Sequence, residues 1–453
     1  MERGGWTPGN RLLTAGLVFM TTAVGFEGLA VPTVLPATLD EFGGLPLYGW
    51  AFSGFWLSNL VGIAVAGREA DRRGPLAAYV AGAGLFAAGL VIAGLAPNMA
   101  WVVAGRVVQG LGAGAIASIT YVLIARGYDP DAQPGMIAVV QSAWVVPGLV
   151  GPALAGYLAQ EHSWRWAFLG LAPLLPLATL LLIVPVRRLG RAAGEAGAGS
   201  LRAVTDAIQL AVGASLLLSA GALGHPLLAV VVAVIGLGLA ARPLQTLLPA
   251  GTVVARHGRP AAVAMLALIS VAFFGAEAFV PLAVSSVRNS GTIAGGLALT
   301  AAAVTWAIGS WIQARMASSG HRRALTAGGT GLVALGIGFE VVIPLTSVAP
   351  VWLAAVGWAI AGLGMGISYS MLTLASIEGV PNGTEGAAAA SVQLAEALGI
   401  AVGAGITGTI VALGAVPVGL APAIALAELS MIVVCGLAIV LAQRLAERSS
   451  ERA

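Results

Sequence analysis

Glutamates inside apolar segments are the residues of this sequence best suited to chemistry. Glu27 lies in FEGLAVP and Glu277 in FGAEAFVP, two similar stretches about 250 residues apart. An ionisable side chain in such a segment is costly and is read as functional by default. Burial favours the neutral form of a carboxylic acid and a nearby cation favours its ionised form, so such a glutamate can take up and release a proton. The glutamates inside apolar runs, where we find no aspartate, are Glu27, Glu277, Glu340, Glu396 and Glu428.

One arginine inside an apolar run offers a partner for the first of these glutamates. Arg106 enters its run from the same side as Glu27 and at a similar depth. We hypothesise that Arg106 holds Glu27 ionised until a substrate or a change of conformation separates them. Two plainer interpretations stay open: Glu27 as a neutral acid bonded to backbone, and Arg106 as a structural tie, because its planar fork bonds carbonyl groups well. Glu277 is the candidate for a second protonatable or cation-binding group.

A second set of side chains is suited to line a cavity. Gln393 lies one helical turn before Glu396 on the same face, and Trp144 aligns with Glu396 in the repeat described below. An amide, a carboxylate and a facing indole would suit a cationic ligand, because a ring face attracts a cation. Packing against lipid or another helix is the alternative for Trp144. The residues predicted to line the cavity are Gln109, Gln141, Trp144, Trp358, Gln393 and Glu396.

The composition places these residues in a membrane protein. The chain has 453 residues, 58% hydrophobic and 9% charged, with a mean hydropathy of +0.94, whereas soluble domains are about 25% charged. The 63 glycines fit closely packed transmembrane helices. One cysteine, Cys435, excludes a disulfide framework, and no histidines pair at metal-ligand spacing. We expect no metal, no cofactor and no nucleic acid.

Fourteen apolar runs approach the length of about 20 residues that crosses a bilayer. If both termini are cytoplasmic, only Arg165 and Arg288 of the 22 arginines fall on outer loops, and only Arg106 falls inside a span. The positive-inside rule therefore predicts cytoplasmic termini. We expect a multi-pass protein of a bacterial plasma (inner) membrane. The predicted spans are 12–36, 48–67, 76–96, 99–125, 136–158, 166–186, 206–224, 226–241, 261–284, 292–314, 324–346, 351–376, 386–412 and 417–441.

An internal repeat divides these spans into two halves. A shift of 252 residues lays GLGAG (110–114) on GLGMG (362–366), and VQSAWVVPGLVGPALAG (140–156) on VQLAEALGIAVGAGITG (392–408). Arg106 then coincides with Trp358. Two spans without a counterpart remain in the middle, and because two is an even number the halves keep one orientation, as in six-plus-six transporters.

The predicted fold is therefore an all-α polytopic membrane protein with two six-helix bundles in a parallel pseudo-repeat and two extra central helices. In this arrangement Glu340 and Glu428 fall on peripheral spans. A direct role in transport is therefore less expected for these two residues than for the other glutamates. The predicted domains are a first bundle over 1–190, a linker with two inserted helices over 191–258, and a second bundle over 259–453.

Three motifs resemble those of the major facilitator superfamily. GREADRRG (67–74) is similar to its loop signature between spans two and three, RVVQGLGAG (106–114) to its fourth-span motif, and PGLVGPALAG (147–156) to its fifth-span motif associated with antiporters. With the two extra spans, the whole chain resembles the fourteen-span drug:proton antiporter group. The resemblance implies a gating role, including a cytoplasmic latch at Asp71, for Gly67, Asp71, Arg72, Gly74, Pro147, Gly151, Pro152 and Gly156.

The sequence departs from the family pattern at several points. Pro75 and Leu76 replace the basic pair that usually follows the loop signature, and its counterpart in the second half, ARMASSGHRR, lacks the aspartate. Pro147 stands where the fifth-span motif has glycine, and Glu27 where the fourteen-span group usually has aspartate. Arg72 has a second interpretation as a determinant of topology.

The resemblance implies a proton-coupled multidrug exporter that works by alternating access, uses the proton gradient and acts as a monomer in the lipid bilayer. Its substrates would be amphipathic small molecules, cationic or neutral, and it would confer antibiotic resistance. A carrier of one metabolite or lipid-like substrate is the alternative. A polytopic membrane enzyme would need a catalytic cluster at an interfacial loop, and the sequence offers none.

Overall fold

Every regular element of the described chain is a helix. The computed structural model describes residues 8–129, 131–189, 201–223, 225–316, 321–378, 380 and 385–446. The first half comprises α1 (Pro8–Phe42), α2 (Leu45–Arg73), α3 (Pro75–Gly94), α4 (Met99–Gly127), α5 (Gln133–Ser142), α6 (Val145–Glu161), α7 (Arg165–Leu169) and α8 (Leu174–Arg188). The central part comprises α9 (Leu201–Ala220) and α10 (Pro226–Leu247). The second half comprises α11 (Arg259–Glu277), α12 (Val280–Leu282), the π-helix η1 (Ala283–Val287), α13 (Gly291–Met316), α14 (Arg322–Val342), η2 (Ile343–Leu345), α15 (Trp352–Ile377), α16 (Glu385–Val418), α17 (Leu420–Leu441) and η3 (Ala442–Arg444).

Fourteen helical segments of the described chain are long and apolar enough to cross a membrane. The predicted all-α fold with fourteen spans is therefore confirmed. Helices suit this role because they satisfy their backbone hydrogen bonds internally, as a segment in lipid must. The ninth span, Arg259–Val287, is interrupted: α11 ends at Glu277, and the span finishes in the π-helix η1. Such π-helical turns are frequent at functional sites.

The glycine repeat has the same structural role in both halves. In the first, Gly110 and Gly114 of α4 approach the backbone of α2, and Gly112 approaches α3; a Cβ at any of them would overlap backbone atoms of the neighbouring helix. In the second, the corresponding helix α15 approaches α13 and α14 in the same alternation. The glycines that do so are Gly362 and Gly366 against α13, and Gly364 against α14. Glycine thus permits the close helix packing of each bundle, and the parallel pseudo-repeat is confirmed.

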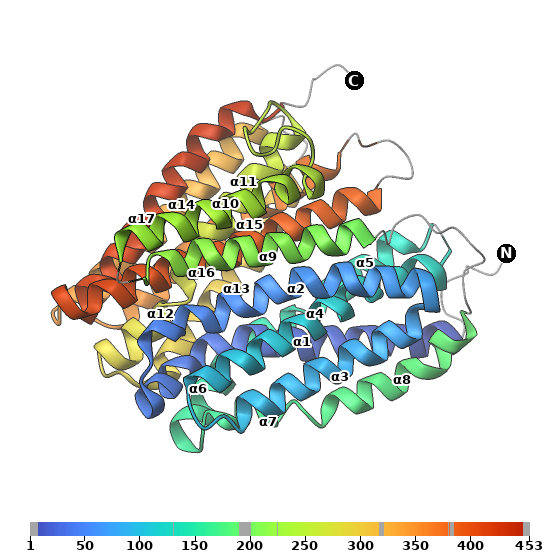
Figure 1. Cartoon of the computed structure of the whole chain (residues 1–453), viewed down its shortest axis with the longest axis horizontal. Helices are drawn as coiled ribbons and strands as arrows, with labels where there is room; N and C mark the ends of the chain where they lie inside the picture. Colours follow the sequence, from blue (N-terminus) through green and yellow to red (C-terminus); the bar gives the residue numbers. More distant parts are fainter. Residues whose placement is uncertain are drawn as a thin grey trace.

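The two halves meet at one end of the molecule and diverge toward the other (Figure 1). We call the end that carries the turn between α1 and α2 at Gly43 and Gly44 the closed end. There the start of α2 crosses the end of α16, where Gly49 lies against Gly408 and Ser53 Oγ donates to the Ala401 carbonyl at 2.8 Å. The helices α6 and α13 form the second contact between the halves at the same end.

The inserted helices α9 and α10 pack against each other, and α9 also covers the line where α2 meets α16 (Figure 1). Thr409 of α16 donates to the Leu218 carbonyl of α9 at 3.3 Å. α10 is the most exposed span, and its buried residues are Gly236, Ala240 and Pro243. One expectation is corrected: Asp206 is an aspartate inside a span, on α9, where it is 5% exposed and accepts from Thr246 Oγ1 at 2.9 Å. The stretch 191–200 lies outside the described residues, and the predicted domain boundaries stay a prediction.

Candidate functional site

The first half contains a fully buried ion pair between α1 and α4. The Arg106 guanidinium contacts the Glu27 carboxylate, and the two side chains are 3% and 0% exposed. The same guanidinium donates to Gln109 Oε1 at 3.1 Å and to the Ala51 carbonyl at 3.0 Å, and it lies 4.1 Å over the Phe55 ring. The predicted contact between Glu27 and Arg106 is therefore present.

This arrangement leaves capacity for another hydrogen-bonding group. In the described chain, Glu27 Oε2 and Gln109 Nε2 are buried and have no hydrogen-bond partner. Arg106, by contrast, is held by a carbonyl, an amide and a ring face in addition to the carboxylate. A proton on Glu27 would neutralise the carboxylate, and the arginine would keep its other contacts. The geometry is thus suited to an exchange between an ion pair and a protonated acid beside a held cation.

The equivalent position in the second half is aromatic and apolar. Trp358 is 0% exposed and stacks on Phe273 of α11, with ring centroids 4.8 Å apart and planes 21° apart. Trp358 was predicted to line the cavity; this placement is wrong, because the ring is enclosed in the core of the second bundle. Trp358 replaces Arg106 in the repeat, and its stacking partner on α11 is an aromatic ring instead of a carboxylate. Glu277 lies one turn further along α11, at its last residue, and is 8% exposed.

A cluster of aromatic and polar side chains lies around Glu396 on α16. Tyr369 of α15 donates its hydroxyl to Glu396 Oε2 at 2.8 Å. The Trp306 ring of α13 lies 5.5 Å from the Tyr369 ring and 6.1 Å from the Phe274 ring of α11. All four side chains are partly exposed. A carboxylate beside three rings is an arrangement that binds organic cations.

The first half contributes Tyr121 to this cluster. Tyr121 lies on α4 and interacts with Gln393 and Glu396 of α16, so the cluster spans both halves. We refer to Tyr121, Phe274, Trp306, Tyr369, Gln393 and Glu396 as the central cluster. Gln393 and Glu396 were predicted, whereas the four aromatic residues were missed. For Tyr369 the sequence offered a weak signal, because it lies three residues after Gly366 on the span that carries Trp358, a predicted cavity residue.

Two other residues predicted for the cavity lie elsewhere on the fifth span. Trp144 packs against α1, where a Cβ added to Gly25 would lie 3.1 Å from the indole, and its side chain is 38% exposed. The ring that contacts Glu396 is therefore that of Tyr369 and not that of Trp144. Gln141 is exposed on α5. Gln109 lies in the ion-pair cluster, on the same helix face as Arg106.

The loop signature lies at the end of the molecule opposite the closed end. Asp71 is in the last turn of α2 and lies 4.0 Å from Arg126 of α4. Arg72 instead contacts Glu69 one turn before it, at 3.2 Å. Gly74 connects α2 to α3 with φ of 88°, a conformation that favours glycine. Gly67 faces Ser118 of α4, where an added Cβ would lie 3.6 Å from the hydroxyl.

The fifth-span motif forms the second contact between the halves. Gly156 accepts at its carbonyl from Thr292 Oγ1 of α13 at 2.8 Å. Pro152 faces α13, where a Cβ on Gly296 would lie 2.3 Å from the Pro152 carbonyl oxygen. Pro147 and Gly151 face α1 instead, against Gly25 and Phe26 respectively. A gating role of these residues remains a prediction, but Pro152 and Gly156 do lie where the halves meet.

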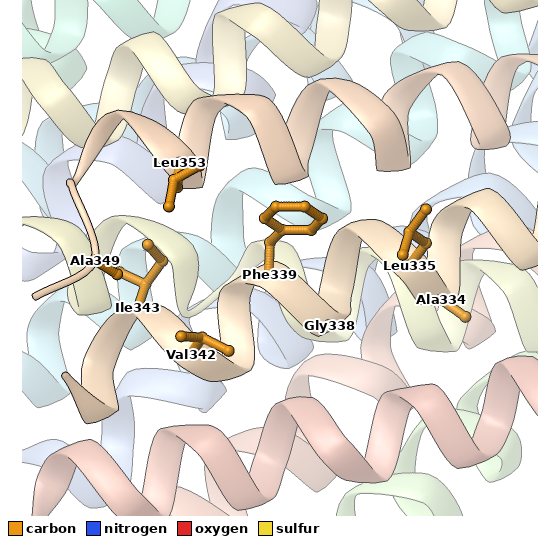
Figure 2. A pocket seen from close by; sticks show the side chains of 8 residues that line it. All are labelled: Ala334, Leu335, Gly338, Phe339, Val342, Ile343, Ala349 and Leu353. Carbon is orange, nitrogen blue, oxygen red and sulfur yellow. The ribbon is translucent and has the colours of Figure 1, made fainter.

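Two surface hollows flank the second half. One, of about 500 Å³, is lined in part by Tyr369 together with Gln313, Ser370 and Thr373, so it adjoins the central cluster. The other lies between α14 and α15 near the closed end, and all its lining side chains are apolar (Figure 2). No group of three metal-ligating side chains occurs among the residues that the structure describes.

Fold and site together define a membrane transporter built of two related bundles. The family model for the Major Facilitator Superfamily matches residues 13–404. A "Probable multidrug-efflux transporter" of Mycobacterium tuberculosis is 30% identical over 438 residues and 90% of each chain. The "Multidrug transporter protein MdtP" of Bacillus subtilis is 25% identical over 168 residues, 37% of this chain and 31% of that one. The chain belongs to the Major Facilitator Superfamily. The relatives named above are transporters, and the chain is a transporter and not an enzyme.

Solved structures show the same fold at low sequence identity. A POT family transporter in complex with 5-aminolevulinic acid aligns with a TM-score of 0.71 and 14% identity over 96% of each chain. A bacterial homolog to the human lysosomal transporter Spinster, in an inward-facing and occupied conformation, aligns with a TM-score of 0.69 and 14% identity over 97% of each chain. Both alignments cover nearly the whole length of this chain.

Proposed function

We propose that this protein is a proton-coupled exporter of amphipathic small molecules, with organic cations as its preferred substrates. The observation that carries the proposal is the buried ion pair of Glu27 and Arg106, since an ionisable pair inside a membrane is costly and marks ion pathways. The multidrug-efflux relative, which is 30% identical over 90% of this chain, supports the class of substrate.

The proposed cycle alternates access between the two sides of the membrane. Both arginines predicted to be extracellular lie at the closed end: Arg165 forms a bidentate ion pair with Glu41 at the end of α1, at 2.8 Å, and Arg288 donates to carbonyls of the loop after α14. With the positive-inside rule, we propose that the closed end faces outward and that the described state is the inward-facing one. The opposite state would separate α2 from α16 at the closed end and bring the loop signature toward the second half.

The proton step is assigned to Glu27. In the ionised state Arg106 holds the carboxylate; a proton arriving on Glu27 forms the neutral acid and breaks the ion pair, while Arg106 keeps the Ala51 carbonyl, Gln109 and the Phe55 ring. The Arg106 charge then has only neutral partners, and because a buried charge without a counterion is costly, protonation of Glu27 raises the free energy of this packing. The ionised and protonated states then favour different packing of α1 against α4.

The substrate step is assigned to the central cluster. Glu396 supplies a negative charge, and Tyr369 and Trp306 supply ring faces, which together attract a flat organic cation. Because Tyr121 comes from the other half, a bound ligand would contact both halves and respond to their movement.

Ethidium, a flat organic cation, provides the test. Cells that express the protein should export ethidium, and an ionophore that collapses the proton gradient should abolish the export. Export of ethidium that continues in the presence of the ionophore would show that transport is not coupled to the proton gradient. If ethidium and neutral amphipathic dyes are not exported while one metabolite is, the chain is instead a carrier of that specific substrate.

A further inference from the structure

Two buried carboxyl groups in the second half belong neither to the ion pair nor to the central cluster. Glu340 lies in the last turn of α14, and Glu428 lies in the first half of α17. Each is 1% exposed. The helices α14 and α17 are packed together, and η2, which directly follows α14, also contacts α17. The two carboxyl groups are close enough for their charges to interact.

Most of the oxygen atoms of this pair have no partner. Within the described chain, both carboxyl oxygens of Glu340 and Oε2 of Glu428 are buried without a hydrogen bond. Gly357 of α15 permits the close approach of Glu340, since a Cβ there would lie 3.1 Å from Glu340 Oε1. An unpaired buried carboxylate costs several kcal/mol, and two carboxylates that share an apolar site cannot both ionise.

The described chain shows no arginine paired with either glutamate. Arg288, at the same end of the bundle, donates to the carbonyls of Ile343 and Ala349 instead. On α14 the arginines are at the first two positions, at the opposite end from Glu340. The other titratable groups on the elements packed against the pair are Arg259, Glu277, Tyr369, Glu385, Glu396, Cys435 and Arg444; Arg259 and Glu385 are the first residues of α11 and α16. Tyr369 and Glu396 bond each other, and Arg444 bonds the carbonyls of Val254 and Ala255.

We propose that Glu340 and Glu428 form a second proton-binding site, in which the two carboxyl groups share at least one proton through an O–H···O hydrogen bond. The shared proton satisfies oxygens that otherwise lack partners and removes the repulsion of two buried charges. The site lies in the second bundle, apart from Glu27 and Arg106. It requires no substrate and no particular direction of transport, so it stands independently of the proposed function.

Counting protons on unfolding tests the site. Purified protein without substrate is unfolded at pH 7 in weak buffer, where an unfolded glutamate, with an ordinary pKa of about 4.3, ionises. Wild type should release at least one more proton per molecule than Glu340→Gln/Glu428→Gln. The control, Glu161→Gln, changes an exposed glutamate of α6 and should release as many as wild type. Equal counts for wild type and the double variant would overturn the proposal.

Infrared spectroscopy of the single variants keeps the test valid if the double variant does not fold. Each single variant retains one buried acid, so it should still release more protons than the double variant. The carbonyl stretch of the shared acid should nevertheless move in both Glu340→Gln and Glu428→Gln, and it should shift in heavy water. A spectrum unchanged by both substitutions would show that the pair holds no proton.

Discussion

Gly49 is the residue at which a single methyl group should change the balance between the two conformations. It lies where α2 crosses α16 at the closed end. A Cβ at this position would lie 2.8 Å from the Ala404 carbonyl oxygen and 2.8 Å from the Gly408 Cα, whereas ordinary contacts begin at 3.4 Å. The obstructing atoms are backbone, so the helices must separate. Gly49→Ala should therefore disfavour the state that is closed at this end.

The size of the effect follows from the cost of overpacking, about 1–3 kcal/mol for a methyl group forced into a well-packed contact. With about 1.4 kcal/mol for each factor of ten, the closed-end state should lose roughly 5- to 150-fold in population relative to the opposite state. The matched control is Gly84→Ala on α3, where an added Cβ meets no atom within 4 Å. It makes the same change of residue on a membrane helix without the obstruction.

The assay measures the distance between spin labels across the closed end. Cys435 is the only cysteine in the chain, so Cys435→Ala provides a cysteine-free background. Labels at Asp40→Cys and Ser286→Cys would report the separation of the halves, because the Ser286 hydroxyl lies 3.4 Å from Asp40 Oδ1. Gly49→Ala should reduce the short-distance population and Gly84→Ala should not. A distance distribution unchanged by Gly49→Ala would refute the assignment of this crossing as a gate.

Two further substitutions test the site assignments. Glu396→Gln should weaken the binding of ethidium by about 10- to 100-fold, as expected for the loss of a charged partner worth about 1.5–3 kcal/mol, and should change the binding of a neutral dye much less. Equilibrium fluorescence titration measures both affinities. Equal losses for the two dyes would contradict an electrostatic role of Glu396. Trp358→Ala should lower stability by about 3–5 kcal/mol through a cavity in the second bundle, measured as a lower thermal unfolding temperature, while Trp358→Phe should lower it much less. If Trp358→Ala left stability unchanged but abolished ethidium binding, Trp358 would line the cavity as the sequence predicted.

The fold was largely predictable because membrane helices are specified by local composition. Each span needs only length and apolarity, and the GLGAG and GLGMG stretches showed the repeat because close packing of α4 and α15 requires glycine at those positions. The ion pair was predictable for a related reason: a single arginine and a glutamate at matching depth in apolar runs have few other ways to be satisfied.

The central cluster was not predictable because it depends on which face of each helix turns toward the other half. Tyr369 and Trp306 are ordinary aromatic residues in apolar runs, and only the packing of α15 and α13 brings them beside Glu396. Trp358 was misplaced because the repeat predicts position but not environment: the stacked Phe273 encloses the ring. The repeat also placed Glu277 on the helix equivalent to that of Glu27, but the residue of α11 that stacks on Trp358 is Phe273.

The pair of Glu340 and Glu428 shows the same limit. Both residues were recognised in the sequence as buried carboxyl groups on peripheral spans. Their proximity arises because the last turn of α14 lies beside the first turns of α17, which the spacing along the chain does not show.

Proton movement driven by substrate in liposomes tests the central claim most directly. Wild-type protein and Glu27→Gln are reconstituted with a pH-sensitive dye inside the vesicles, and ethidium is added to one side. The glutamine keeps the size of the side chain and can still accept a hydrogen bond from Arg106, but it cannot titrate. The account predicts that wild type moves protons on ethidium addition and that Glu27→Gln, although folded and able to bind ethidium, does not. An undiminished proton signal in Glu27→Gln would show that Glu27 is structural and that coupling belongs to another glutamate.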